Sequence, residues 1–302
     1  MSKQVPDRAE TFLDHVAHFV PSLDVGAATL ERLGFRLTPF TAQQNWTPNG
    51  MVPAGMANHC VMLREGYIEF LTAVADTELA RQFRAAIARH VGPHLIAFST
   101  GDLDLAHGIL ESNGFRPQPP VNLVRPVSDA DGQLREARFS VLRVPPETMP
   151  EGRIQLLKHH TEDIVWQPRW LGHPNGIVGL KAVLLATADP EESARRFGCF
   201  VGRVPVRRYQ RWVLQLDRGA CVFIEHSALH QVVPWVHAAK PAPWIVGMAL
   251  ESEDTGRTRE HFAAGGLQPH ETAPSEAVYG LPPELGGFAT VLPAGADVSW
   301  AA

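Results

Sequence analysis

Glu69 stands in the middle of an apolar run, GYIEFLTAV, where a charged side chain is unusual. Burying a carboxylate there costs free energy unless it meets a partner, a metal ion or water. His15 stands in a second apolar run, DHVAHFV. A carboxylate and an imidazole that share one space can act as an acid–base pair, which makes Glu69 the first candidate for a catalytic base, beside His15.

Strand alternation predicts the orientation of both residues. Side chains two residues apart on a strand point to the same face, so His15 should share a face with Ala17 and Phe19. By the same rule Glu69 should share a face with Tyr67. We therefore expect both candidates to point away from the face that the helices cover.

Four residues further along the chain are candidates for binding a substrate: Arg153, Gln155, His159 and His160, all in GRIQLLKHH. An arginine can hold an anionic group with two parallel hydrogen bonds, although a solvated surface position is the simpler interpretation for any arginine. The two histidines at the end of this run could supply an additional imidazole.

Other catalytic motifs are missing from the sequence. The cysteines Cys60, Cys199 and Cys221 are far apart and have no CxxC spacing, which argues against a disulfide framework or a thiolate metal site. There is no Walker loop, no GxGxxG after a strand and no GxSxG elbow.

The elements that must position these residues repeat along the chain. DHVAHFVPSLDVGAATLERLGF, from Asp14, and LIAFSTGDLDLAHGILESNGF, from Leu95, follow one plan. Each contains an apolar strand, a helix cap at Ser22 or Asp102, an amphipathic helix and a glycine that ends it. Short β-like runs follow each helix, so each unit is predicted to be β-α-β-β-β.

The pattern recurs less clearly from Leu180 and from Trp244. We therefore expect two pairs of modules, as internal repeats of this length indicate. Residues 1–165 should hold modules at about 13–75 and 93–160, and residues 166–302 a diverged pair at about 176–230 and 243–295.

Composition narrows the function classes. A chain of 302 residues with 45% hydrophobic and 20% charged residues fits two globular domains. Its net charge of -5 argues against a nucleic-acid partner. The N-terminal MSKQVPDRAE lacks an apolar signal and no run is long enough to span a bilayer, so we expect no membrane partner and a cytoplasmic location.

Four motifs in order give the chain a family resemblance: DHVAHFVPSLD with LGF, GMANHCVML with GYIEFL, HLIAFSTGDLD with NGF, and HHTEDIVWQPRWLGHPNG. With them the chain resembles the vicinal-oxygen-chelate superfamily, of the glyoxalase, bleomycin-resistance and extradiol-dioxygenase type. The resemblance implies an α+β fold. Its repeated βαβββ modules would form open cupped mixed β-sheets with flanking helices around a small-molecule cavity.

The resemblance also implies a divalent metal, Zn, Fe, Mn or Ni, that acts as a Lewis acid. Its ligands would come from the first and last strands of a module, here His15 and Glu69. The second module departs from this pattern, because Leu95 stands where a histidine is expected and Gln155 where a glutamate is expected. A cavity without a metal is therefore the alternative.

Three functions follow from these alternatives, all with a small organic molecule as partner and with a monomer or homodimer as the assembly. The first is a metal-dependent lyase, isomerase or dioxygenase-type enzyme acting on a small oxygenated substrate. The second is a metal-free ligand-binding or sequestering protein of the resistance type. The third is a cofactor-free enzyme in which Glu69 acts as a base beside His15.

Overall fold

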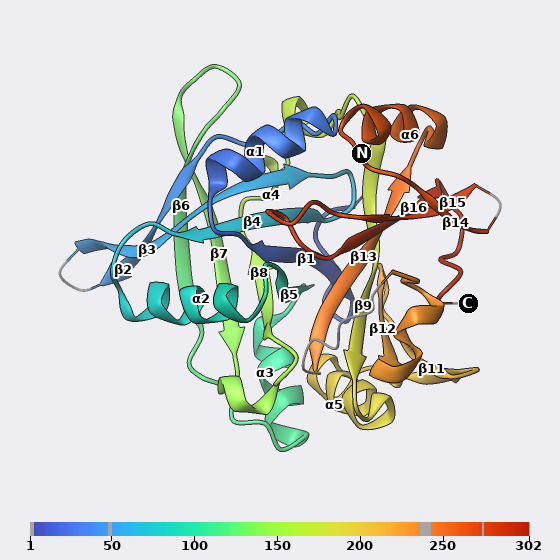
Figure 1. The fold of residues 1–302 in the computed structure, drawn as a ribbon. Helices are drawn as coiled ribbons and strands as arrows, with labels where there is room; N and C mark the ends of the chain where they lie inside the picture. The colour runs from blue at the N-terminus through green and yellow to red at the C-terminus, as the bar shows by residue number, and fades with distance from the viewer. Residues whose placement is uncertain (1–2, 48–49, 236–242, 274, 302) are drawn as a thin grey trace.

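The computed structural model describes residues 3–47, 50–235, 243–273 and 275–301. The chain forms four consecutive βαβββ units (Figure 1). The first comprises β1 (Thr11–Phe19), α1 (Leu23–Arg32), β2 (Thr41–Thr47), β3 (Gly50–Met62) and β4 (Tyr67–Ala73). The second comprises β5 (Gly92–Thr100), α3 (Leu103–Ser112), β6 (Val121–Ser128), β7 (Leu134–Arg143) and β8 (Arg153–His159).

The second half of the chain repeats this order. The third unit comprises β9 (Ile177–Thr187), α5 (Pro190–Val201), β10 (Val206–Arg208), β11 (Arg211–Gln215) and β12 (Ala220–Glu225). The fourth comprises β13 (Trp244–Ser252), α6 (Thr255–Ala264), β14 (His270–Ala273), β15 (Glu276–Gly280) and β16 (Phe288–Pro293). The remaining helical segments are α2 (Glu78–Arg89), α4 (Glu162–Val165), η1 (Pro146–Thr148), η2 (Pro168–Trp170) and η3 (His226–Gln231).

Equivalent side chains cap the helix that follows the first strand of each unit. Ser22 accepts a hydrogen bond from Val25 N, and Asp102 accepts one from Leu105 N, as the sequence predicts. Asp189 and Asp254 do the same for α5 and α6. The repeated cap explains why helices of different sequence begin at the same point of each unit.

Two consecutive units join into one mixed sheet of eight strands. The order is β2-β3-β4-β1-β5-β8-β7-β6 in the first sheet and β10-β11-β12-β9-β13-β16-β15-β14 in the second. The units meet through antiparallel pairs at the centre, β1 with β5 and β9 with β13. The predicted α+β fold of cupped, repeated βαβββ modules is thereby confirmed. We call the two sheets the first cup and the second cup.

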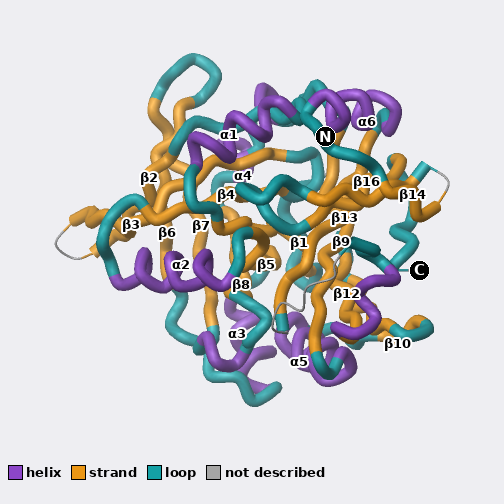
Figure 2. Tube along the Cα trace, in the orientation of Figure 1, coloured by secondary structure: helices purple, strands orange, loops and turns teal. Residues whose placement is uncertain are grey.

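The outer faces of both cups and the helices share one hydrophobic core. It contains Leu30 of α1, Leu110 of α3, Phe197 of α5 and Phe262 of α6 together with strand residues from all four units. Helix α1 contacts α6, and α3 contacts α5 (Figures 1 and 2). The connection between the cups runs from β8 to β9 through α4 and η2, so the predicted boundary at residues 165 and 166 falls within it. The division into two domains at this boundary stays a prediction.

The inner faces of the two cups differ. In the second cup, Leu229, Val232 and Val233 around η3 and Val298 and Trp300 near the C-terminus pack into the cluster that covers the strands. The first cup is covered over part of its face by Phe83 and other residues of α2, and the rest lines a cavity. None of the helices in the described ranges combines the length and the apolar character needed to cross a membrane.

Candidate functional site

The cavity of the first cup has a volume of about 380 Å³. Its walls carry apolar side chains, including Leu71, Phe83, Leu95, Leu123, Phe139, Val141 and Leu157. The edge strands of the cup approach each other at its rim, where Arg125 Nη1 of β6 donates to Gln44 O of β2 at 2.6 Å. The cavity therefore has largely apolar walls, and residues from every strand of the first cup line it.

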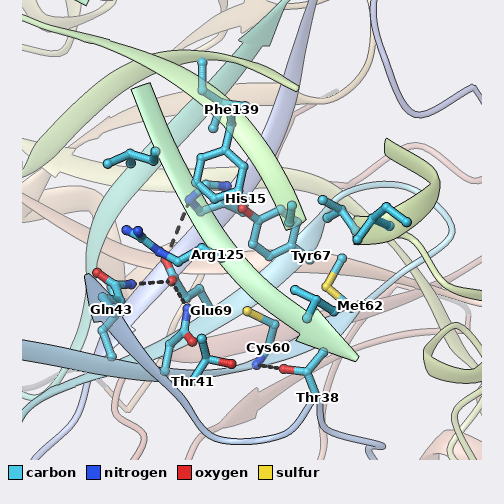
Figure 3. A pocket seen from close by; sticks show the side chains of 18 of the residues that line it. His15, Thr38, Thr41, Gln43, Cys60, Met62, Tyr67, Glu69, Arg125 and Phe139 are labelled. Atoms are coloured by element: carbon cyan, nitrogen blue, oxygen red, sulfur yellow. Dashed lines mark hydrogen bonds and ion pairs between the residues drawn. The ribbon is translucent and has the colours of Figure 1, made fainter. Parts of the chain in front are cut away.

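His15 and Glu69 point into this cavity from neighbouring strands (Figure 3). Strands β1 and β4 pair in parallel, with His15 beside Tyr67 and Ala17 beside Glu69. The exposed fractions of His15 and Glu69 are only 3% and 8%. The shared orientation predicted from strand alternation is what the sheet shows.

The reactive atoms of the two residues face each other across a short gap. His15 Nε2 lies 3.8 Å from Glu69 Oε2, which is too long for a direct hydrogen bond. The other oxygen of Glu69 is held in place by hydrogen bonds. Glu69 Oε1 accepts hydrogen bonds from Asn58 Nδ2 at 2.5 Å and Gln43 Nε2 at 3.4 Å.

Asp14 holds His15 from behind. Its Oδ1 lies 2.8 Å from His15 Nδ1, and its Oδ2 lies 3.1 Å from His159 Nε2, a residue of β8 that also lines the cavity. Burial alone would raise the pKa of Asp14, but the adjacent His159 and His15 hold it well below its ordinary value through their charge and hydrogen bonds. Asp14 is therefore an ionised acceptor that receives an N–H from each imidazole.

A β-bulge in β1 makes this arrangement possible. Leu13 packs in the helix-side core while His15 lines the cavity, although regular alternation would place both on one face. The register shifts between Leu13 and His15, so Asp14 is the inserted residue. Leu13 N, next to the bulge, donates to Arg218 O of the second cup at 2.8 Å, so this backbone donor is satisfied by the other half of the chain.

The hydrogen bonds define which atoms are available for chemistry. Because His15 Nδ1 donates to Asp14, a neutral His15 presents the lone pair of Nε2 to Glu69. Two proton acceptors thus face each other inside the cavity. Both atoms line the cavity, where either can receive a proton from a bound molecule.

Two further side chains of the cavity remain protonated. Burial, followed by the charge of Glu69, raises the pKa of the Cys60 thiol well above its ordinary value. Burial, followed by the charges of Asp14 and Glu69, does the same for the Tyr67 phenol. Cys60 is therefore a poor nucleophile at neutral pH, whereas Tyr67 can donate a hydrogen bond to a substrate oxygen.

The predicted substrate-binding residues divide into two groups. Arg153, Gln155 and His159 line the cavity. His160 does not, because its Nε2 lies 2.8 Å from Ser140 Oγ, on the side of β7 opposite to that of Phe139. Their roles in binding stay predictions. Arg143, which sequence reasoning missed, lines the cavity opposite Gln155 in the register of β7 and β8.

The donor set for a metal is incomplete. In the parts of the chain that the structure describes, no group of three or more His, Cys, Asp and Glu side chains is placed to hold an ion. His15 and Glu69 offer two ligands, and the equivalent positions of the second module carry Leu95 and Gln155. These residues do not fit the four-ligand site that the resemblance implies, and the metal role of His15 and Glu69 stays a prediction.

Comparisons with known proteins agree with the fold. A sequence model described as a glyoxalase-like domain matches residues 13–198, from β1 into α5. No curated protein matches the chain.

Solved structures match over nearly the whole chain. A hypothetical protein from Staphylococcus aureus has a TM-score of 0.64 at 11% identity and covers 94% of this chain and 99% of its own. The Mn(II)-bound glyoxalase from Novosphingobium aromaticivorans has a TM-score of 0.57 at 11% identity, with 97% and 85% covered. The 2,3-dioxygenase LapB from Pseudomonas sp. KL28 has a TM-score of 0.55 at 11% identity, with 94% and 92% covered. At such identity the likeness shows a shared fold.

Proposed function

Because the chain belongs to the glyoxalase-like domain family of the vicinal-oxygen-chelate superfamily, we propose that it is an enzyme that moves a proton on a small oxygenated organic molecule, as an isomerase or lyase does. The observation that carries this proposal is the 3.8 Å separation of His15 Nε2 and Glu69 Oε2 inside the cavity. No metal step enters the mechanism, since the donor set is incomplete.

Glu69 is the general base of the proposed reaction. Its Oε2 takes a proton from the substrate carbon next to a carbonyl, and the electron pair of the C–H bond forms an enolate. His15, whose Nδ1 stays bonded to Asp14, presents its Nε2 lone pair toward the protonated Glu69 across the 3.8 Å gap. Return of the proton to a different atom gives isomerisation, and loss of a leaving group from the enolate gives elimination.

The enolate oxygen needs hydrogen-bond donors. Tyr67 and Arg125 both line the cavity near Glu69 (Figure 3). Burial lowers the pKa of Arg125, and the charge of Glu69 opposes this shift and so favours the charged guanidinium. Fixed donors in a poorly hydrated site stabilise a developing oxyanion without reorganisation, and these two residues are suited to that role.

The test is deuterium exchange. Phenylpyruvate is incubated with the protein in D₂O, and the loss of its benzylic C–H signal is followed by NMR. Glu69→Gln keeps an acceptor for Asn58 and should lower the protein-dependent exchange by about 10²-fold or more. Equal exchange by the variant would refute the role of Glu69, and thermal unfolding of both proteins controls for folding.

A second candidate function is a ligand-binding or sequestering protein. It is favoured by Leu95 and Gln155, which extend the apolar and neutral lining at the positions where the family resemblance implies ligands. The two functions differ in one readout, because a sequestering protein binds compounds in the cavity and leaves their C–H bonds unexchanged.

A further inference from the structure

Two arginines enter the cavity from strands on the other side of the cup from Glu69. Arg153 of β8 lies beside Leu95 in the register, and Arg143 of β7 lies beside Gln155. Arg143 Nε donates to Gln155 Oε1 at 3.2 Å. Strands β1 and β5 separate β4 from β8, so the backbones of Glu69 and Arg153 are about 14 Å apart at three interstrand spacings. The two groups thus face one cavity from opposite walls.

Neither guanidinium has an anionic partner in the described chain. Among the residues that the structure describes, no carboxylate lies within ion-pair distance of Arg143 or Arg153, whereas the half-buried Arg196 meets both Glu151 and Glu192. Burial, and then the charges of Arg153 and Arg125, lower the pKa of Arg143 to about 9. Burial also lowers the pKa of Arg153. Two adjacent, partly desolvated cations are costly unless an anion joins them.

The rest of the cavity is apolar between these two ends. Leu95, Leu123, Val141 and Leu157 line the space, and its volume of about 380 Å³ falls in the range of small-molecule pockets, roughly 300–1,000 Å³. A ligand that matches this lining has an apolar body and a single anionic group. Arginine suits carboxylate in particular, because its two N–H groups match the two oxygens.

We propose that Arg143 and Arg153, with Gln155 between them, form a subsite for the carboxylate of an apolar organic acid. This inference rests on the proposed function for the reacting end of the substrate, which would lie toward Glu69. Anion binding itself can be measured without turnover, so the two proposals can fail separately.

Two fluorescent probes of the same aromatic skeleton test the subsite: anilinonaphthalene sulfonate, which is anionic, and N-phenylnaphthylamine, which is neutral. We expect the anionic probe to bind at one site per chain. Arg143→Gln and Arg153→Gln should each weaken it at least about tenfold, as for loss of a hydrogen bond to a charged group. The neutral probe should change less than about twofold. Arg153→Lys, which keeps the charge, should retain most of the affinity.

Arg89→Gln is the matched control. Arg143 and Arg153 also line a second hollow. Arg89 lines that hollow and does not line the cavity. Loss of anionic-probe binding in Arg89→Gln equal to that in Arg153→Gln would place the anion in that hollow and overturn the proposal. Equal weakening of both probes in the Arg143 and Arg153 variants, or no binding of the anionic probe by the wild type, would also overturn it.

Competition then identifies the ligand class. Phenylpyruvate should displace the anionic probe, and phenylpyruvamide, which has the same carbon skeleton without the charge, should displace it at least about tenfold less well. Equal displacement by the two compounds would contradict the carboxylate subsite. Displacement by phenylpyruvate without any Glu69-dependent exchange would leave the subsite standing and refute the proposed enzyme.

Discussion

Asp14 and His159 lie 145 residues apart in sequence, yet Asp14 Oδ2 and His159 Nε2 are 3.1 Å apart beneath the cavity. The same carboxylate holds His15 Nδ1 at 2.8 Å. One buried acid therefore ties the first module to the second and sets the tautomer of the imidazole that faces Glu69. Next to the bulge that carries this acid, Leu13 N donates to Arg218 O of the second cup, so the two halves of the chain are in contact beside the site.

Replacing Asp14 by Asn should impair the site through the tautomer of His15. An amide can donate to Nδ1 and so place the proton of His15 on Nε2, facing Glu69. Loss of the orienting carboxylate in a comparable acid–imidazole pair is very costly, and we expect phenylpyruvate exchange to fall by about 10²-fold or more. His159→Gln keeps an N–H for Asp14 and should have a much smaller effect. Nitrogen chemical shifts of labelled histidine would report the tautomer, and an unchanged shift in Asp14→Asn would contradict this interpretation.

His18 should make the protein less stable in mild acid. Burial lowers its pKa to about 4 from an ordinary value of 6.5, although the hydrogen bond from its Nδ1 to Leu285 O opposes the shift. The unfolded chain therefore binds the proton more readily. Stability is complete above pH 6.5 and decreases as the pH falls toward 4. The expected loss from this residue between about pH 8 and pH 5 is roughly 2 kcal/mol.

His18→Asn isolates that contribution. The Asn amide can still donate to Leu285 O and has no proton to gain in this range. His94, whose pKa burial lowers to about 3, contributes to the pH dependence of both proteins. Urea unfolding at several pH values should therefore give a flatter dependence for the variant. If the free energy of unfolding depended on pH equally in both proteins, His18 would not take up a proton on unfolding.

Glu151→Gln should destabilise the contact between the two halves. The fully buried Glu151 side chain, just before β8, receives Arg196 Nη1 of α5 at 2.8 Å and Nη2 at 2.6 Å. Removing the buried partner leaves Arg196 with only the exposed Glu192 carboxylate, and we expect a cost of about 3 kcal/mol, the lower end for a buried ion pair. Glu192→Gln removes the exposed partner of the same arginine and should cost under about 1 kcal/mol. Equal losses in the free energy of unfolding for Glu151→Gln and Glu192→Gln would contradict the expected effect of burial.

Trp300→Ala should reduce stability without changing ligand binding. Trp300 is 2% exposed within the cluster that fills the second cup, and its Nε1 donates to Thr290 Oγ1 at 3.0 Å. Large-to-small replacements of this kind cost about 3–5 kcal/mol. Binding of the anionic probe at a temperature where the variant is folded should be unchanged. Loss of that binding would show that the second cup takes part in the ligand site.

The local sequence pattern was sufficient to predict the architecture and part of the candidate site. Strand alternation places His15 and Glu69 on one face, and repeated caps at Ser22 and Asp102 indicate the units. Asp14 was not foreseeable, because regular alternation assigns it to the opposite face and the local sequence pattern does not reveal the bulge. Long-range packing likewise determines the placing of Arg143 in the cavity and the filling of the second cup around Trp300.

The most direct test of the central claim is deuterium exchange into phenylpyruvate by untagged protein that has been treated with a chelator and assayed for metal, beside Glu69→Gln. We predict exchange that needs Glu69 and survives the chelator, in a protein without a stoichiometric metal ion. Stoichiometric metal that is lost in Glu69→Gln, with exchange abolished by the chelator and restored by the ion, would contradict the account.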